Sequence, residues 1–528
     1  MSQASELIQE GLAQIQQGNP KTAVTLFSQV LDADEHSVFA YANRACAYSG
    51  LGEHHRALED INQAIELAPN DFQLYFNRAH VYEQLGYTEQ ALINYNQSIN
   101  LNPKAIEPYF NRAMALEQQD PQQAITDLST VIELHADYQA AYLKRGQLYC
   151  QQGQLQKASE DFTQVLTLNP QSETAQNLLN EIISFYNEQL GQQPERVDYY
   201  VNRGEIFRKL KRLDAALSDW RYALKLNTDD PLLYSNLGGL CYEMGDNTQA
   251  LEYFNQSLAR APNIATTYKH RALVLVHQHK TEDALADLNR AIELDPQQFD
   301  FWYLRGRLLR QQQQLEAALA DLGQVIQLKA DYAFAYDERG YTLLALGQAE
   351  SALEDFLKAL KYQPTADRYY RCGIILATQE QLLDALLYLT KALEAAPDYV
   401  EALTERGQIY YELARFDRAL ADFDAAIRMN PTYHVAWAYR ANMHVRYQQW
   451  QQAINDASHA IGLAPQYAYP YQLRAQAYQE KHLFRKAIED LNQFLKLEPE
   501  NKAVQEQLAQ LSPQHNGGWR WLPNWFKR

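Results

Sequence analysis

Apolar and small residues recur along the chain as pairs of short helical stripes. Within residues 38–71, Tyr41, Ala45 and Tyr48 are spaced by four and three positions, so they share one face of a helix. A second stripe follows, with one helical face formed by Ala57, Ile61, Ala64 and Ile65. Pro69 ends this stripe, because proline cannot continue a helix. The segment predicts two helices joined by a turn at 50–53, with small residues that let the helices approach closely.

The same arrangement repeats along most of the chain. One column is always alanine, at Ala23, Ala57, Ala91, Ala124, Ala158, Ala216, Ala250, Ala284, Ala318, Ala352, Ala385, Ala419, Ala453 and Ala487. Ten of its 13 steps have the length of the step from Ala23 to Ala57, two are one position shorter, and the step from Ala158 to Ala216 is much longer. Companion columns carry glycine or alanine, mostly an aromatic residue, and a proline that ends most units. This fixed period predicts about 14 units, each covering the apolar flank of its neighbours.

This pattern of aromatic, small, alanine and proline positions resembles the tetratricopeptide repeat family, whose unit is a 34-residue helix–turn–helix. The resemblance covers roughly residues 4–501. It implies an all-α fold, in which the helix pairs stack into a right-handed superhelical solenoid. It also implies that the first helix of each unit lines a concave groove in which polypeptide partners lie.

Arginine and aspartate vary together at a fixed spacing. In nine units an arginine precedes an aspartate by the interval that separates Arg44 from Asp60, and in one shortened unit Asp127 follows Arg112 one position sooner. Where the arginine is replaced, the aspartate is also replaced, and only Arg78 with Asn94 breaks the pattern. The covariation predicts an arginine–carboxylate contact between the two helices of a unit. The alternative is a row of arginines that binds acidic ligands.

The long step from Ala158 to Ala216 divides the predicted array. We expect five repeats over residues 1–172, an extra helix and junction over 173–196, and nine repeats over 197–501. A long helix spliced into one unbroken superhelix is the alternative. Residues 502–511 predict a capping helix, which a solenoid needs to cover its last apolar face.

Composition narrows the function. The chain has 528 residues and a net charge of −18, which argues against nucleic acid as a partner because phosphate binding needs a basic face. Four widely spaced cysteines, no signal sequence and no long apolar stretch predict a cytoplasmic protein. The repeat occupies nearly the whole chain, and no catalytic, cofactor or metal motif stands out, so we expect no enzyme activity, cofactor or metal. The oligomeric state stays open.

The residue before the arginine column is asparagine in five units: Asn43, Asn77, Asn111, Asn202 and Asn236. This ladder resembles the one in the repeat half of the O-linked N-acetylglucosamine transferase, where such amides hold a peptide backbone. An amide both donates and accepts hydrogen bonds, so it can pair with a main chain without reading its sequence. The alternative is that these asparagines cap or solvate the first helix.

Aromatic residues occupy other predicted groove positions: Phe76, Phe110, Tyr303 and Tyr370. Aromatic side chains in a concave surface suit the apolar anchors of a partner. The alternative is that they pack in the core between units.

The C-terminal segment 512–528 differs from the repeats. Three of the seven tryptophans lie here, in the motif Trp519, Trp521, Trp525 and Phe526, followed by two basic residues. We expect a flexible tail that folds back on the last units, docks on a partner as a linear motif, or contacts a membrane interface. Membrane contact is expected only through this tail.

The sequence predicts a non-catalytic scaffold that binds protein or peptide partners in the concave groove. The alternative function is a membrane-proximal assembly factor or adaptor, recruited through the tryptophan-rich tail.

Overall fold

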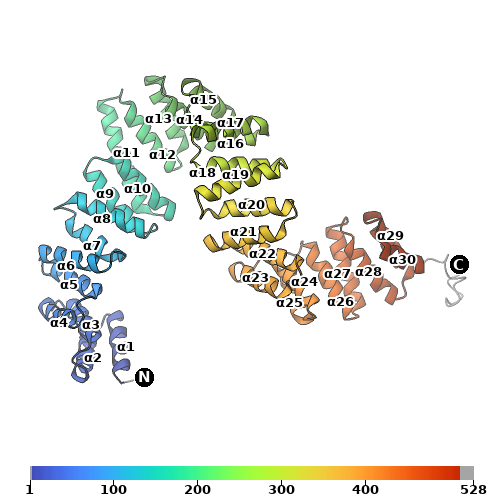
Figure 1. Ribbon diagram of the computed structural model, residues 1–528, viewed down its shortest axis with the longest axis horizontal. Coiled ribbons are helices and arrows are strands. Elements are labelled where there is room, and N and C mark those ends of the chain that lie inside the picture. The colour runs from blue at the N-terminus through green and yellow to red at the C-terminus, as the bar shows by residue number, and fades with distance from the viewer. Residues whose placement is uncertain (1–2, 512–528) are drawn as a thin grey trace. The chain divides into compact units, whose positions relative to one another are not determined.

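The computed structural model describes residues 3–511, and within this range it contains 30 α-helices and no strand. The all-α prediction is confirmed. The described residues divide into two compact units, residues 3–262 and 263–511. Within each unit, consecutive helices pack in antiparallel pairs joined by short turns (Figure 1).

The first unit contains α1 (Gln3–Gln16), α2 (Pro20–Ala33), α3 (Val38–Gly50), α4 (His54–Leu67), α5 (Phe72–Gln84), α6 (Thr88–Leu101), α7 (Ile106–Leu116), α8 (Pro121–Leu134), α9 (Gln139–Gln151), α10 (Leu155–Leu168), α11 (Glu173–Gln192), α12 (Val197–Lys209), α13 (Leu213–Leu226), α14 (Pro231–Glu243) and α15 (Asn247–Arg260). The second unit contains α16 (Ala265–His277), α17 (Thr281–Leu294), α18 (Phe299–Gln311), α19 (Leu315–Leu328), α20 (Ala333–Ala345), α21 (Ala349–Tyr362), α22 (Ala366–Thr378), α23 (Leu382–Ala395), α24 (Val400–Glu412), α25 (Phe416–Met429), α26 (His434–Arg446), α27 (Trp450–Leu463), α28 (Tyr469–Glu480), α29 (Phe484–Leu497) and α30 (Lys502–Leu511).

Side-chain caps and left-handed turns set the ends of many of these helices. Ser37 begins α3 by accepting a hydrogen bond from the backbone N–H of Ala40. Gly52, with φ of +77°, reverses the chain between α3 and α4, because glycine tolerates left-handed backbone. In several repeats of the second unit a non-glycine residue takes the same conformation, as at Ala414 with φ of 57°.

Small residues sit where the two helices of a repeat cross. A Cβ added to Gly407 would lie 2.6 Å from the ring of Phe423, and one added to Gly340 would lie 2.9 Å from Phe356. These glycines leave room for a bulky side chain on the second helix. The predicted close approach of the helices is therefore confirmed, and the size of the facing side chain explains the glycines at these crossings.

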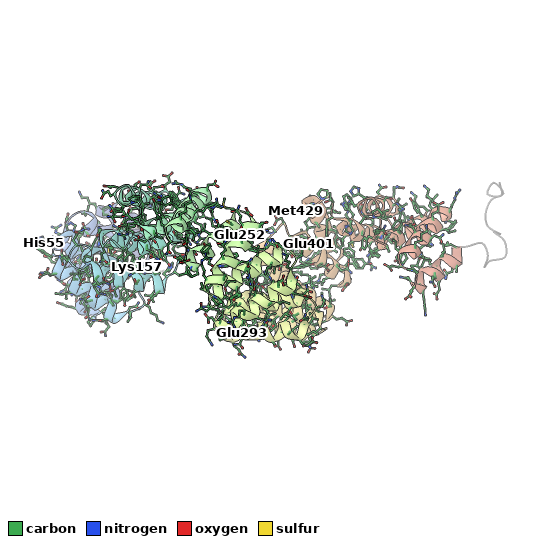
Figure 2. The ribbon with its side chains drawn as sticks, turned by 90° about the horizontal axis from the view of Figure 1, so that it is seen from above. His55, Lys157, Glu252, Glu293, Glu401 and Met429 are labelled. Carbon is green, nitrogen blue, oxygen red and sulfur yellow. The ribbon has the colours of Figure 1, made fainter. Side chains whose placement is uncertain are left out.

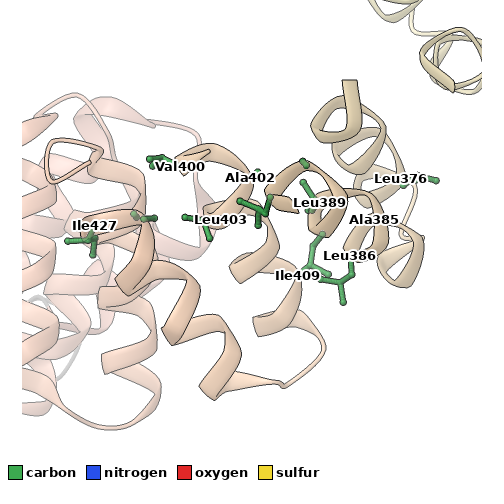
Figure 3. Close-up of a cluster of buried hydrophobic side chains, with 13 residues drawn as sticks. Leu376, Ala385, Leu386, Leu389, Val400, Ala402, Leu403, Ile409 and Ile427 are labelled. Carbon is green, nitrogen blue, oxygen red and sulfur yellow. The ribbon is translucent and has the colours of Figure 1, made fainter. Parts of the chain in front are cut away.

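The core runs from one helix pair to the next. One cluster runs from α22 to α26, and Leu389 of α23, which is fully buried, belongs to it together with Leu376 and Leu403 (Figure 3). Each repeat thus completes the core of its neighbour, which is how a stack of short helix pairs gains stability.

The predicted arginine–aspartate contact is confirmed in all ten pairs. Each guanidinium donates from Nε and Nη2 to the two oxygens of one aspartate, at 2.6–3.0 Å. The exception keeps the contact in neutral form, because Arg78 Nε donates to Asn94 Oδ1 at 2.8 Å. Since the aspartates are buried and already paired, the alternative of a free arginine row for acidic ligands is wrong.

The same arginines also bind the preceding helix pair, a contact that was not predicted from the sequence. In most units Nη1 donates to a side chain 16 residues earlier, at 2.5–3.5 Å. These acceptors are Ser28, Asn62, Asn96, Ser129, Asn187, Asn289, Thr390, Asp424 and Ser458. One guanidinium therefore fixes three helices: the two of its own repeat and the last helix of the repeat before it.

Helix α11 has 20 residues and combines both helices of a repeat in one. Its front half follows the register of a first helix, since Ser172 caps Ala175, and Ala175 lies one repeat period after the equally buried Ala141. Its back half follows the register of a second helix, because Asn187 accepts from Arg203 at 2.6 Å across the usual 16 residues. The long step in the alanine column spans one full unit and one shortened unit, so α11 corresponds to a repeat that lacks its turn.

Candidate functional site

The five predicted asparagines lie on the first helices α3, α5, α7, α12 and α14 of the first unit. Asn236 is exposed and the other four are half-buried. Asn43 donates to the backbone oxygen of Phe39 at 2.8 Å, and Asn77 accepts from Gln73 at 3.1 Å. The side chain of Asn236 has no hydrogen bond to any residue that the structure describes. Part of the hydrogen-bonding capacity of Asn43 and Asn77, and all of that of Asn236, is open to a partner.

Two of the asparagines have structural partners. The amide of Asn111 acts on the hydroxyl of Tyr95, which donates to Glu83 at 2.8 Å, and the amide of Asn202 acts on the hydroxyl of Tyr186, with the same spacing along the chain in both pairs. Burial raises the pKa of both tyrosines, so their hydroxyls stay protonated and need partners. These two amides serve the core as well as the surface, and the five positions are not equivalent.

The four predicted groove aromatics are half-buried and pack against other rings. In the first unit, Phe76 lies 6.0 Å from Tyr95 and Phe110 lies 5.4 Å from Tyr138, measured between ring centroids. In the second unit, Tyr303 lies 5.3 Å from Tyr332 and Tyr370 lies 5.0 Å from Tyr399. Both interpretations hold in part: the rings pack between helices, and the remainder of each stays accessible.

A cleft of about 540 Å³ lies beside the merged helix α11 in the first unit. Its walls are the turn from α9 to α10, the back half of α11 and the start of α12. Its lining residues include Asn202, Tyr199 and the exposed ring of Phe185, together with Lys157, which is labelled in Figure 2. The cleft adds aromatic and amide groups to the surface that carries the asparagines.

A group of tyrosines around α24, α26 and α28 in the second unit was not predicted from the sequence. Tyr433 and Tyr467 lie just before the first helices α26 and α28. Tyr332 and Tyr399 occupy the same position before α20 and α24. The sequence does carry a signal for Tyr433 and Tyr467, because each follows the proline that ends a unit by two residues. This position is not part of the aromatic column that identifies the family. Glu405 of α24 is a half-buried carboxylate whose charge acts on the hydroxyls of Tyr433 and Tyr467.

Within residues 3–511 the structure holds no group of three or more histidine, cysteine or acidic side chains that could bind a metal ion. No helix in that range is long and apolar enough to cross a membrane. The predicted tail motif of Trp519, Trp521, Trp525 and Phe526 lies outside the described residues.

Sequence models of the tetratricopeptide repeat family match most of the chain. The matched residues are 38–71, 72–105, 140–172, 229–297, 270–333, 338–400, 400–433 and 468–501. The chain belongs to the tetratricopeptide repeat family. Members of this family bind protein or peptide partners and are generally non-catalytic, and the chain is a protein–protein interaction scaffold.

Similarity to individual proteins is partial. The chain is 27% identical over 161 residues to DnaJ homolog subfamily C member 3 of Bos taurus, covering 26% of this chain and 32% of that protein. It is 29% identical over 99 residues to protein FlbA of Caulobacter vibrioides, covering 19% and 17%. The chain thus spans at most about a third of the length of these relatives.

Solved structures of similar proteins include YrrB, described as a tetratricopeptide repeat protein with an unusual peptide-binding site. It is 26% identical, with a TM-score of 0.32, and the match covers 35% of this chain and 95% of YrrB. The Cut9–Hcn1 assembly is 15% identical with a TM-score of 0.39, and the match covers 97% of this chain and 96% of that one.

Proposed function

We propose that the first helices of the first unit hold an extended polypeptide segment along the asparagine positions. The observation that carries the proposal is an amide with open hydrogen-bonding capacity at the same position of several first helices: Asn43 and Asn77 on the successive first helices α3 and α5, and Asn236 on α14. An extended main chain offers donors and acceptors at regular intervals, and an amide can pair with either.

Aromatic side chains next to these amides supply the apolar contacts. Phe76 and Phe110 are half-buried beside Asn77 and Asn111 on α5 and α7. A partner would gain affinity from side chains that pack on these rings, while the amides would fix the direction and register of its backbone. No catalytic step is part of this function.

The test uses short random peptides displayed on phage and selected on the full chain. Selected peptides are then titrated by fluorescence polarisation against the triple variant Asn43→Ala, Asn77→Ala and Asn236→Ala. Loss of one hydrogen bond to a partner costs about 1 kcal/mol, so we expect the triple variant to bind at least about tenfold more weakly.

The matched control is Asn227→Ala, an exposed asparagine in the turn after α13 of the same unit. This change should leave the affinity unaltered. Circular dichroism checks that the triple variant keeps its helix content. Equal affinity of the triple variant and the original chain would show that these amides do not hold the peptide.

A further inference from the structure

A second surface, in the second unit, combines tyrosine rings with one carboxylate. We call it the tyrosine–glutamate surface, and it consists of Glu405, Tyr370, Tyr433, Tyr439, Tyr467 and Tyr469. These residues come from, or directly precede, the consecutive first helices α22, α24, α26 and α28. All six are half-buried, so each offers part of its side chain to solvent.

The rings stand close to one another and to the carboxylate. The ring centroids of Tyr439 and Tyr469 are 6.2 Å apart, and those of Tyr467 and Tyr469 are 6.4 Å apart. The charge of Glu405 acts on the hydroxyls of Tyr370, Tyr439 and Tyr467, and also on that of Tyr433. Glu405 therefore lies among rings contributed by three neighbouring repeats.

The side-chain hydroxyls of these tyrosines and the carboxylate of Glu405 have no hydrogen-bond or ion-pair partner among residues 3–511. Two arginines on these first helices are already paired: Arg406 with Asp422 at 2.8 Å, and Arg371 with Asp367 at 2.7 Å. Arg446 of α26 lies against other rings, 4.1 Å from the ring centroid of Phe416 and 5.9 Å from that of Tyr411. Burial raises the pKa of Glu405, and the neighbouring carboxylate of Glu412 raises it further. An ionised carboxylate in this setting is stabilised when a cation approaches it.

Elsewhere the chain shows what such a combination holds. Arg371 lies 4.5 Å from the ring centroid of Tyr341 while it pairs with Asp367. Arg196 lies 4.3 Å from the ring centroid of Tyr199 while it pairs with a neighbouring aspartate at 2.6 Å. In both places a ring face and a carboxylate share one guanidinium. The tyrosine–glutamate surface presents the ring and the carboxylate without an arginine of the chain between them.

We propose that the tyrosine–glutamate surface binds a lysine or arginine side chain of a polypeptide partner. The proposal rests on the proposed function, since it assumes that the chain binds polypeptides. Cation–π attraction to tyrosine and a charge-assisted hydrogen bond to a carboxylate act on the same cationic group. A purely apolar side chain would instead cover the Glu405 carboxylate and the hydroxyls without pairing them, which costs free energy. A nucleic acid would be repelled by the carboxylate.

The test again uses the full chain and phage-displayed random peptides, here with counter-selection. Peptides are selected on the original chain in the presence of an excess of soluble Glu405→Gln variant, so that only peptides that need the Glu405 charge survive. We expect the survivors to be enriched in lysine or arginine relative to the starting library. In a surviving peptide that carries an arginine, replacing this arginine by citrulline, its neutral analogue, should weaken binding at least about tenfold, because a charged hydrogen bond is lost.

Glu394→Gln is the matched control, since Glu394 is exposed on α23 and the change removes the same charge. Survivors should bind this variant as tightly as the original chain. If no peptide survives the counter-selection, or if the survivors carry no basic residue, the inference is overturned. The proposed function would still be supported by peptides that bind both the original chain and the Glu405→Gln variant. If no peptide is selected even without the competitor, the proposed function fails, and this inference fails with it.

Discussion

Two adjacent glycines of α14 give a direct measure of how tightly the helices of a repeat are packed. A Cβ added to Gly238 would lie 2.6 Å from two ring atoms of Phe254, whereas one added to Gly239 meets nothing within 4 Å. Replacing glycine by alanine within a helix gains about 1 kcal/mol at either position. Overpacking a core costs about 1–3 kcal/mol, and only Gly238→Ala incurs it.

The difference between the two variants isolates the packing cost, because the gain in helix propensity is common to both. We expect Gly239→Ala to stabilise the region by about 1 kcal/mol and Gly238→Ala to lie about 1–3 kcal/mol below it. Gly306→Ala should fall between them, since its nearest neighbours are side-chain atoms of Asp321 and Leu322 at 3.1 Å.

The assay is native-state hydrogen exchange, read as local opening free energy, of peptides from α14 and α15 for the Gly238 and Gly239 variants and from α18 and α19 for Gly306→Ala. A local readout is needed because a repeat array need not unfold in one step. Equal stabilisation by Gly238→Ala and Gly239→Ala would refute the reasoning, since it would mean that Phe254 can move aside without cost. Circular dichroism of both variants checks that the helix content is retained.

Three further changes test the energetics of the repeats. Ala414→Gly should stabilise the second unit by about 0.5–1 kcal/mol in urea unfolding, because alanine is strained at a φ of 57°, whereas Ala320→Gly on an exposed helical position should cost about 1 kcal/mol. Arg145→Met should cost about 3–5 kcal/mol by leaving the buried Asp161 unpaired, and a second change, Asp161→Leu, should restore most of it. A hydrogen bond to the buried Asp456 raises the pKa of His444. Protonated His444 therefore stabilises the folded state fully below the pKa of an unfolded histidine, about 6.5, and this stabilisation is lost as the pH rises through the raised pKa. His444→Gln should flatten that part of the melting-temperature profile against pH.

Features with a strict spacing could be predicted from the sequence. The helix pairs follow from the alanine column, and the ten arginine–aspartate contacts follow from residues that change together. The close approach of the helices at Gly407 was predicted, because a small residue recurs at that position, but the facing side chain, Phe423, was not. Each of these depends on contacts within one repeat, where the spacing along the chain fixes the distance in space.

Contacts between repeats were harder to predict. The acceptor that precedes each arginine at a fixed interval varies among serine, asparagine, threonine and aspartate, so no single residue type marks it. The tyrosines around Glu405 come from or just before α22, α26 and α28, and only the stacking of those helices brings them together. The role of such a side chain depends on the surface that the adjacent repeat presents to it. The residues of that surface vary from repeat to repeat.

Helix α11 shows how a repeat array can form a cleft by losing residues. The segment from Ala175 to Asn187 contains no glycine or proline, and Gly191 comes only at the end of the helix, so nothing reverses the chain between the two halves. The back half therefore continues in the direction of the front half, although it keeps the arginine contact of a second helix. Phe185, which lies on this back half, stays 43% exposed and lines the cleft. The aromatic wall of that cleft therefore follows from the absence of a turn and does not require an unusual residue type.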